Sequence, residues 1–86
     1  MGVIFLCREV SRSTGEISVY PAGKATRSSD PLLFVLGMRQ RLNPELQYYA
    51  VSDEEYLKNK DRIEELLKQK EPPRRELLAA CNIAHL

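Results

Sequence analysis

The sequence has little of what metal, redox and nucleophilic chemistry require. Its only cysteines, Cys7 and Cys81, form no CxxC pair, and its only histidine, His85, is one residue from the end. Together these three residues would supply half of the paired ligand motif that zinc sites show. A histidine in that position is also poorly placed to activate a nucleophile. We therefore expect no metal, no cofactor and no catalytic site, with both thiols free and buried. One long-range disulfide between the cysteines is the alternative.

Glycine-rich loops and long apolar runs are also missing. Gly15 and Gly23 are isolated, so the sequence offers no phosphate-binding loop. The apolar run over residues 3–7 is far shorter than a secretory h-region or a membrane span. A secreted domain of this size usually carries more cysteine. We expect a cytoplasmic protein that does not enter a membrane.

Neither sign of charge is in large excess. The formal net charge is +1, so no overall field favours nucleic acid or an anionic membrane. Hydrophobic residues make up 43% of the chain and charged residues 29%, which are ordinary globular values and argue against disorder. A chain of 86 residues is long enough for one domain and too short for two. Residues 1–86 are therefore expected to form a single small domain.

The first part of the chain predicts a β-hairpin. Residues 3–7 are continuously apolar, which is typical of a central strand buried on both faces, and the strand runs on for three more residues. Residues 11–15 have turn composition, and Gly15 can adopt positive φ. Residues 16–20 alternate between polar and apolar, as a half-exposed strand does. The Pro-Ala-Gly sequence at 21–23 is expected to stop that strand.

Residues 30–43 predict a helix at the centre of the chain. Asp30 can cap its first N–H groups, Pro31 suits its first position, and Pro44 cannot continue it. At about 100° per residue, the apolar run over residues 32–36 surrounds nearly the whole circumference. We therefore expect the first half of this helix to be enclosed on all sides. A strand over the same run is the alternative.

A capping box predicts the start of the second helix. Residues 45–51 favour a third strand, and Ser52 is followed three residues later by Glu55, so each side chain can bond the other's backbone N–H. The helix that follows is expected to reach about Lys70. Its apolar face comprises Tyr56, Ile63 and Leu67, flanked by Leu57 and Leu66.

The remaining segments complete the predicted order. Residues 24–29 form a polar loop, Gly37 is expected to mark a close approach to the central helix, and Pro72-Pro73 precedes a last helix over residues 74–84. The elements then run ββαβαα. The predicted fold class is α+β, a three-stranded antiparallel sheet in the order 2-1-3 with three helices and cover on both faces.

A protein-interaction role is the function that remains after these exclusions. We predict a non-enzymatic adaptor, inhibitor or small regulatory subunit that binds another protein or a second copy of itself as a homodimer. Its contact surfaces are expected at the last helix, over residues 77–86, and around Tyr48-Tyr49.

A small nucleic-acid-binding protein is the alternative function. It would use the basic hairpin and loop within residues 8–41, where arginines could contact phosphates and tyrosines could stack on bases. For either function, the candidate partner or nucleic-acid contacts are Arg8, Arg12, Tyr20, Lys24, Arg27, Arg39, Arg41 and Tyr49.

Overall fold

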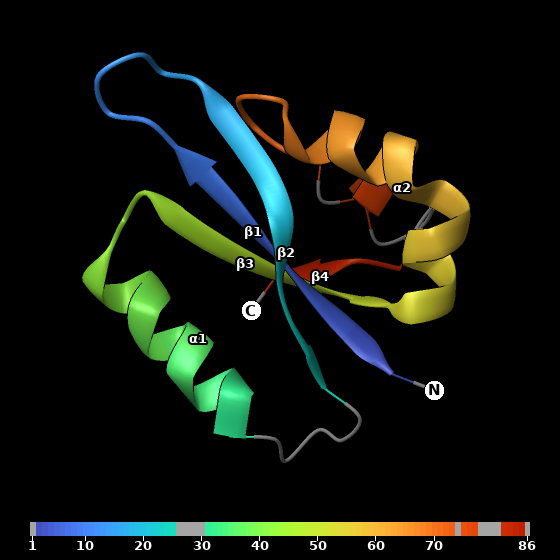
Figure 1. The fold of residues 1–86 in the computed structure, drawn as a ribbon. Coiled ribbons are helices and arrows are strands. Elements are labelled where there is room, and N and C mark those ends of the chain that lie inside the picture. The colour runs from blue at the N-terminus through green and yellow to red at the C-terminus, as the bar shows by residue number, and fades with distance from the viewer. Residues whose placement is uncertain (1, 26–30, 74, 78–81, 86) are drawn as a thin grey trace.

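A computed structural model describes residues 2–25, 31–73, 75–77 and 82–85 and shows a sheet with a helix against each face (Figure 1). The predicted α+β class is confirmed: a three-stranded antiparallel sheet in the order 2-1-3, three helices, and the element order ββαβαα. A short fourth strand, which the sequence did not predict, extends the sheet to the order β2-β1-β3-β4. The elements are β1 (Val3–Val10), β2 (Ile17–Ala25), α1 (Pro31–Leu42), β3 (Leu46–Ser52), α2 (Asp53–Leu67) and β4 (Ala84–His85), and residues 75–77 are helical as well.

The central strand β1 contributes to both halves of the core, as its continuous apolar run predicts. Ile4 and Leu6 belong to the cluster on the α2 side of the sheet. Phe5 and Cys7 belong to the cluster on the α1 side. Because successive side chains of a strand point to opposite faces, a strand buried on both faces needs apolar residues at every position.

The second strand is longer than the sequence predicted. The turn at Gly15 is confirmed, with φ of 73°. However, β2 does not stop at Pro21 but continues to Ala25, so that Lys24 pairs with Ile4 instead of lying in a loop. Proline is tolerated here because β2 is an edge strand, and a register shift opposite Phe5 and Leu6 absorbs the irregularity.

The central helix α1 is confirmed as a helix, but its predicted enclosure is wrong. Pro31 is its first residue, and the proposed cap, Asp30, lies outside the described residues. Only Leu36 within α1 is buried. Gly37 does not mark a close approach either, since a Cβ placed there would meet nothing within 4 Å. The close approach occurs at Gly23, where a Cβ would come within 2.6 Å of the side chain of Leu32.

The second helix begins as predicted. Ser52 is its N-cap, and its Oγ accepts a hydrogen bond of 3.2 Å from the N–H of Glu55. The helix ends at Leu67, earlier than expected, and Asn59 interrupts its regular geometry with φ of −121°. Leu57, predicted to flank the apolar face, is 78% exposed. The buried residues of α2 are Tyr56, Ile63, Leu66 and Leu67.

The last predicted helix is shorter than expected at its C-terminal end. Residues 75–77 are helical, residues 78–81 lie outside the described part of the chain, and Asn82 has positive φ of 49°. A residue in that conformation cannot continue an α-helix. The chain then buries Ile83 in the cluster on the α2 side and pairs β4 with Tyr49 and Ala50 of β3.

Candidate functional site

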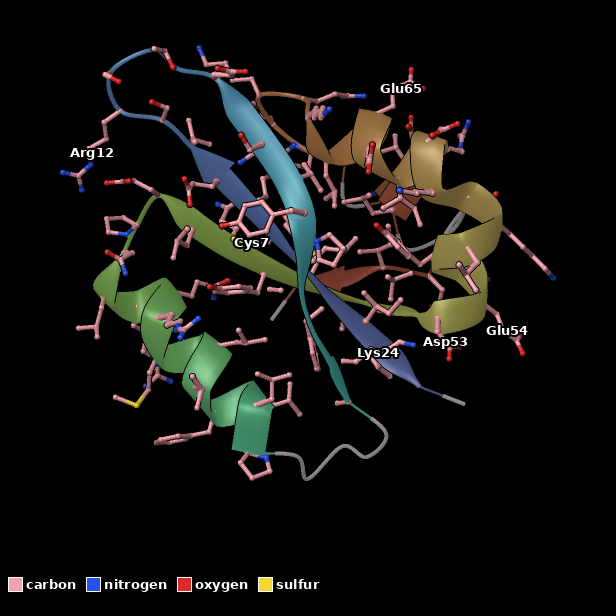
Figure 2. The ribbon with its side chains drawn as sticks, viewed as in Figure 1. Cys7, Arg12, Lys24, Asp53, Glu54 and Glu65 are labelled. Atoms are coloured by element: carbon pink, nitrogen blue, oxygen red, sulfur yellow. The ribbon has the colours of Figure 1, made fainter. Side chains whose placement is uncertain are left out.

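The outer side of α1 carries an apolar surface that the rest of the described chain leaves exposed. Phe34 is 72% exposed and Leu42 is 76% exposed, with Val35 and Met38 at 43% and 45%. At about 100° per residue, Phe34, Met38 and Leu42 fall within about 80° of one another, and Val35 lies beside them. Figure 2 shows side chains projecting from α1 on the side away from the sheet. We call Phe34, Val35, Met38 and Leu42 the α1 stripe.

Arginines border the α1 stripe on both sides. The same helical spacing places Arg41 on the Phe34 side of the stripe and Arg39 on the Val35 side, both toward the C-terminal end of α1. Both arginines are exposed and lie in the last turn of α1, where cations suit the negative end of the helix dipole. Within α1 no acidic residue accompanies them. The stripe is therefore an apolar surface with a positive rim.

The inner side of α1 holds this surface in a fixed orientation. Leu36, 1% exposed, packs in the same cluster as Phe5 and Tyr48. One turn later, the side-chain oxygen of Gln40 accepts a hydrogen bond of 2.8 Å from the backbone N–H of Tyr48. Since that bond satisfies a backbone group of β3, α1 is attached to the sheet by polar as well as apolar contacts. The stripe is consequently presented by a packed helix and not by a loop.

A second notable feature is Arg8, whose charge is buried against the C-terminal end of α2. The side chain is only 4% exposed. Its Nε donates to the carbonyl of Leu67 at 2.7 Å, and its Nη2 donates to the carbonyls of Gln69 at 2.6 Å and Lys70 at 3.0 Å. The last turn of α2 contains no basic residue of its own. Arg8 thus supplies from β1 the cation that the negative end of α2 favours.

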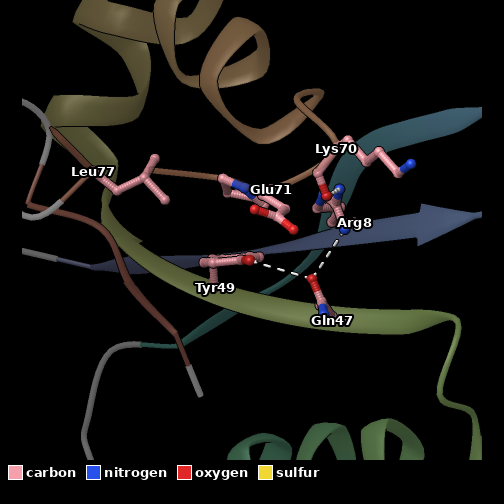
Figure 3. A pocket seen from close by; sticks show the side chains of 7 residues that line it. Arg8, Gln47, Tyr49, Lys70, Glu71 and Leu77 are labelled. Carbon is pink, nitrogen blue, oxygen red and sulfur yellow. Dashed lines mark hydrogen bonds between the residues drawn. The ribbon is translucent and has the colours of Figure 1, made fainter. Parts of the chain in front are cut away.

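A pocket of about 260 Å³ lies beside this cluster (Figure 3). On its β3 wall, the Gln47 side-chain oxygen accepts from Nη1 of Arg8 at 3.1 Å and from the Tyr49 hydroxyl at 3.3 Å. Arg8 is therefore committed to carbonyl and amide oxygens, and its contacts are those of a structural clamp on α2. The lining residues are Arg8, Gln47, Tyr49, Lys70, Glu71, Pro72 and Leu77.

The thiol of Cys7 sits among aromatic hydroxyls on the α1 side of the sheet. Cys7 is free and buried, as predicted, whereas Cys81 lies outside the described residues. Burial raises the pKa of the Cys7 thiol. Burial also raises the pKa of Tyr48, while hydrogen bonding to Cys7, followed by burial, raises that of Tyr20. A thiol that stays protonated at neutral pH is a weak nucleophile, so this cluster has the character of core packing.

The structure separates the residues predicted to make contacts. Arg8 and Tyr49 are not surface groups but buried ones, because their positions in β1 and β3 point toward α2. Arg12 is exposed and pairs with Glu45 at 2.5 Å. Figure 2 shows Arg12 by the β1–β2 loop and Lys24 toward the other end of β2.

The remaining residues predicted to make contacts are Tyr20, Arg27, Arg39 and Arg41. The exposed Tyr20 donates to a carboxylate oxygen of Glu9 at 3.1 Å. Arg27 lies outside the described residues. Only Arg39 and Arg41 of the predicted set lie on α1, beside the apolar stripe. The predicted basic surface is therefore not one continuous patch among the described residues.

The stripe itself was missed by the sequence analysis, although a signal for it was present. Phe34, Met38 and Leu42 recur at intervals of four, which defines one side of a helix. The signal was obscured because α1 is apolar on its inner side too, so the whole run was assigned to the core. The inward position of Arg8 also had a signal, since residues 4, 6 and 8 of a strand share one face.

The described part of the chain contains neither a cluster of metal-ligating side chains nor a helix that could span a membrane. Among residues 2–25, 31–73, 75–77 and 82–85, no three His, Cys, Asp or Glu side chains come together as metal ligands. The helices within those ranges are also too short or too polar to span a bilayer.

The chain matches no family model, no curated protein and no solved structure. Its function therefore has to be inferred from the chemistry of its own surfaces.

Proposed function

We propose that this chain is a non-enzymatic protein-interaction module, an adaptor, inhibitor or small regulatory subunit, that binds a protein partner through the α1 stripe. The observation that carries the proposal is the exposure of four large apolar side chains on one side of a packed helix. Single exposed apolar residues are normal on a protein surface, but a contiguous group with a polar rim is typical of an interaction site. We further propose a cytoplasmic location, where the free Cys7 thiol is stable.

A protein partner suits this surface better than nucleic acid does. The centre of the stripe is aliphatic and aromatic, whereas nucleic acid is contacted chiefly through its phosphates by clustered basic groups. Two of the residues predicted to make such contacts, Arg8 and Tyr49, are buried. Two more, Arg12 and Tyr20, are engaged with the carboxylates of Glu45 and Glu9. Aromatic residues, methionine and arginine are the side chains that protein interfaces favour.

A matched pair of substitutions tests the proposal. Leu42 in the stripe and Leu57 on α2 have nearly equal exposure, 76% and 78%. The immobilised chain is used to capture partners from an extract of the cells that produce it, with and without nuclease. We expect the wild type and Leu57→Asp to retain the same protein after nuclease treatment, and Leu42→Asp to lose it, because a carboxylate would be buried at the contact.

Two results would contradict the proposed function. Equal capture by wild type and Leu42→Asp would mean that the stripe is not the contact. Material that disappears with nuclease and is unaffected by either leucine substitution would favour nucleic-acid binding instead. Circular dichroism of each variant confirms that both remain folded, which the exposure of the two leucines leads us to expect.

A further inference from the structure

On the basis of the proposed function, we infer that the α1 stripe binds an amphipathic helix of another protein whose apolar ridge is flanked by carboxylates. A helix is the occupant because Phe34, Met38 and Leu42 form a ridge along the i, i+4, i+8 row of α1. Ridges of this kind pack into the grooves between side chains of a second helix. Recognition of an amphipathic helix is a recurring mode of protein binding.

The charge of the rim specifies the flanks of that partner helix. Arg41 lies on the Phe34 side of the stripe and Arg39 on the Val35 side, both in the last turn of α1, so each side presents a guanidinium at that end of the helix. Arginine pairs with carboxylates through two parallel hydrogen bonds and is poorly replaced in that role. An incoming helix with Glu or Asp on either side of its apolar face would meet both rims. One with Lys or Arg there would meet like charge.

The same charges disfavour a second copy of α1 as the occupant. Pairing two α1 stripes would bring four arginines to one interface, and α1 has no acidic residue to pair with them. An anionic membrane is disfavoured for a different reason. The whole chain has a net charge of only +1, and attraction to anionic lipid requires several basic residues at the contact. Sedimentation and vesicle binding nevertheless test for a second copy and for a membrane.

Three synthetic helical peptides test the inference on the full chain. Each has the same leucines, spaced three and four apart to make one apolar side, and their flanking positions carry Glu, Gln or Lys. Binding is followed by fluorescence anisotropy of the labelled peptide. We expect the Glu peptide to bind about tenfold more tightly than the Lys peptide, with Gln between them, and the difference to shrink as salt is added.

Reversing the charge of the rim gives the decisive comparison. The double variant Arg39→Glu/Arg41→Glu is expected to reverse the order, so that the Lys peptide binds most tightly. The control is Lys58→Glu/Arg62→Glu, which changes the net charge equally at two exposed positions of α2. That control is expected to keep the wild-type order. It thereby separates the rim of the stripe from the overall charge of the chain.

Several outcomes would overturn the inference, and only the last of them would also overturn the proposed function. Equal binding of the three peptides, or no binding to any of them while stripe-dependent capture of a protein persists, refutes the acidic helix and leaves the module intact. Sedimentation showing a dimer that Leu42→Asp dissociates, with no peptide binding, assigns the stripe to a second copy. Stripe-dependent binding to phosphatidylserine vesicles in place of peptide refutes both proposals.

Discussion

The two helices cover opposite faces of the same sheet, yet they use their apolar residues differently. In α2 the apolar side chains Tyr56, Ile63, Leu66 and Leu67 are buried, and most of the exposed residues are charged. In α1 only Leu36 is buried, while four large apolar residues face away from the sheet. A helix with one apolar face needs only the sheet to cover it, but a helix with two needs something further. The fold of the chain buries the apolar side chains of α2 except Leu57, but it covers only one side of α1.

The same contrast extends to the polar groups at the ends of the helices. Arg8, a buried charge from the central strand, donates to the carbonyl of Leu67, the last residue of α2, and to that of Gln69 just after the helix. The arginines at the end of α1 are exposed and border the stripe. The guanidinium of Arg8 is thus buried inside the molecule, whereas those of Arg39 and Arg41 lie at its surface, where Arg39 also bonds the Tyr48 side chain. Four predictions test this division, in order of decreasing expected effect.

The largest difference in the free energy of unfolding is expected between substitutions on the inner and the outer side of α1. Leu36→Ala should lower the free energy of unfolding by about 2–5 kcal/mol, because it opens a cavity against Phe5 and Tyr48. Phe34→Ala, two residues away, should change it by less than about 0.5 kcal/mol. Urea denaturation followed by circular dichroism measures both. Similar losses for the two variants would mean that α1 does not have one packed and one exposed side.

The clamp on α2 is expected to have the next largest effect. Arg8→Met keeps the apolar stem but leaves the carbonyls at the end of α2 without their donor, at a cost of about 1–3 kcal/mol. The control is Arg12→Met, whose exposed pair with Glu45 should contribute well under about 1 kcal/mol. The same denaturation experiment applies. If Arg12→Met proved as destabilising as Arg8→Met, burial would not be what distinguishes the two arginines.

Alkaline pH should weaken the α1 side of the sheet. The raised pKa of Tyr48 means that the folded state holds its proton more tightly than the unfolded state. Its contribution is therefore fully present at neutral pH and is lost as the pH rises above about 10, where unfolded tyrosine ionises. Urea midpoints measured across this range should fall less steeply in Tyr48→Phe than in the wild type. Parallel curves for the two proteins would exclude Tyr48 as a source of the alkaline loss.

The smallest effect is expected from the glycine of α1, and it has the opposite sign. Gly37→Ala should raise the free energy of unfolding by about 0.5–1 kcal/mol, because alanine favours helix and its Cβ meets no neighbour within 4 Å. Thermal denaturation should show a correspondingly higher midpoint. A loss of stability would indicate that another element does approach α1 at this position, as the sequence alone had suggested.

Much of the fold was predictable because its signals are local. The two-sided apolarity of β1, the turn at Gly15 and the Ser52 cap each depend on a few adjacent residues, and each was confirmed. The continuation of β2 past Pro21 was not predictable from such signals, since proline is acceptable only if the strand lies at the edge of the sheet. That position is a property of the whole sheet. The strand β4 likewise depends on the free edge of β3.

The sequence by itself determined that α1 would be a helix with apolar residues all around it and arginines in its last turn. Only the tertiary structure decided which of those residues face the sheet, because helical periodicity cannot say which side of an apolar helix a neighbour will cover. The sequence also contained the alternation that places Arg8 on the same face of β1 as Leu6. That this face meets the end of α2 was decided by packing, because a buried guanidinium is stable only where acceptors converge on it.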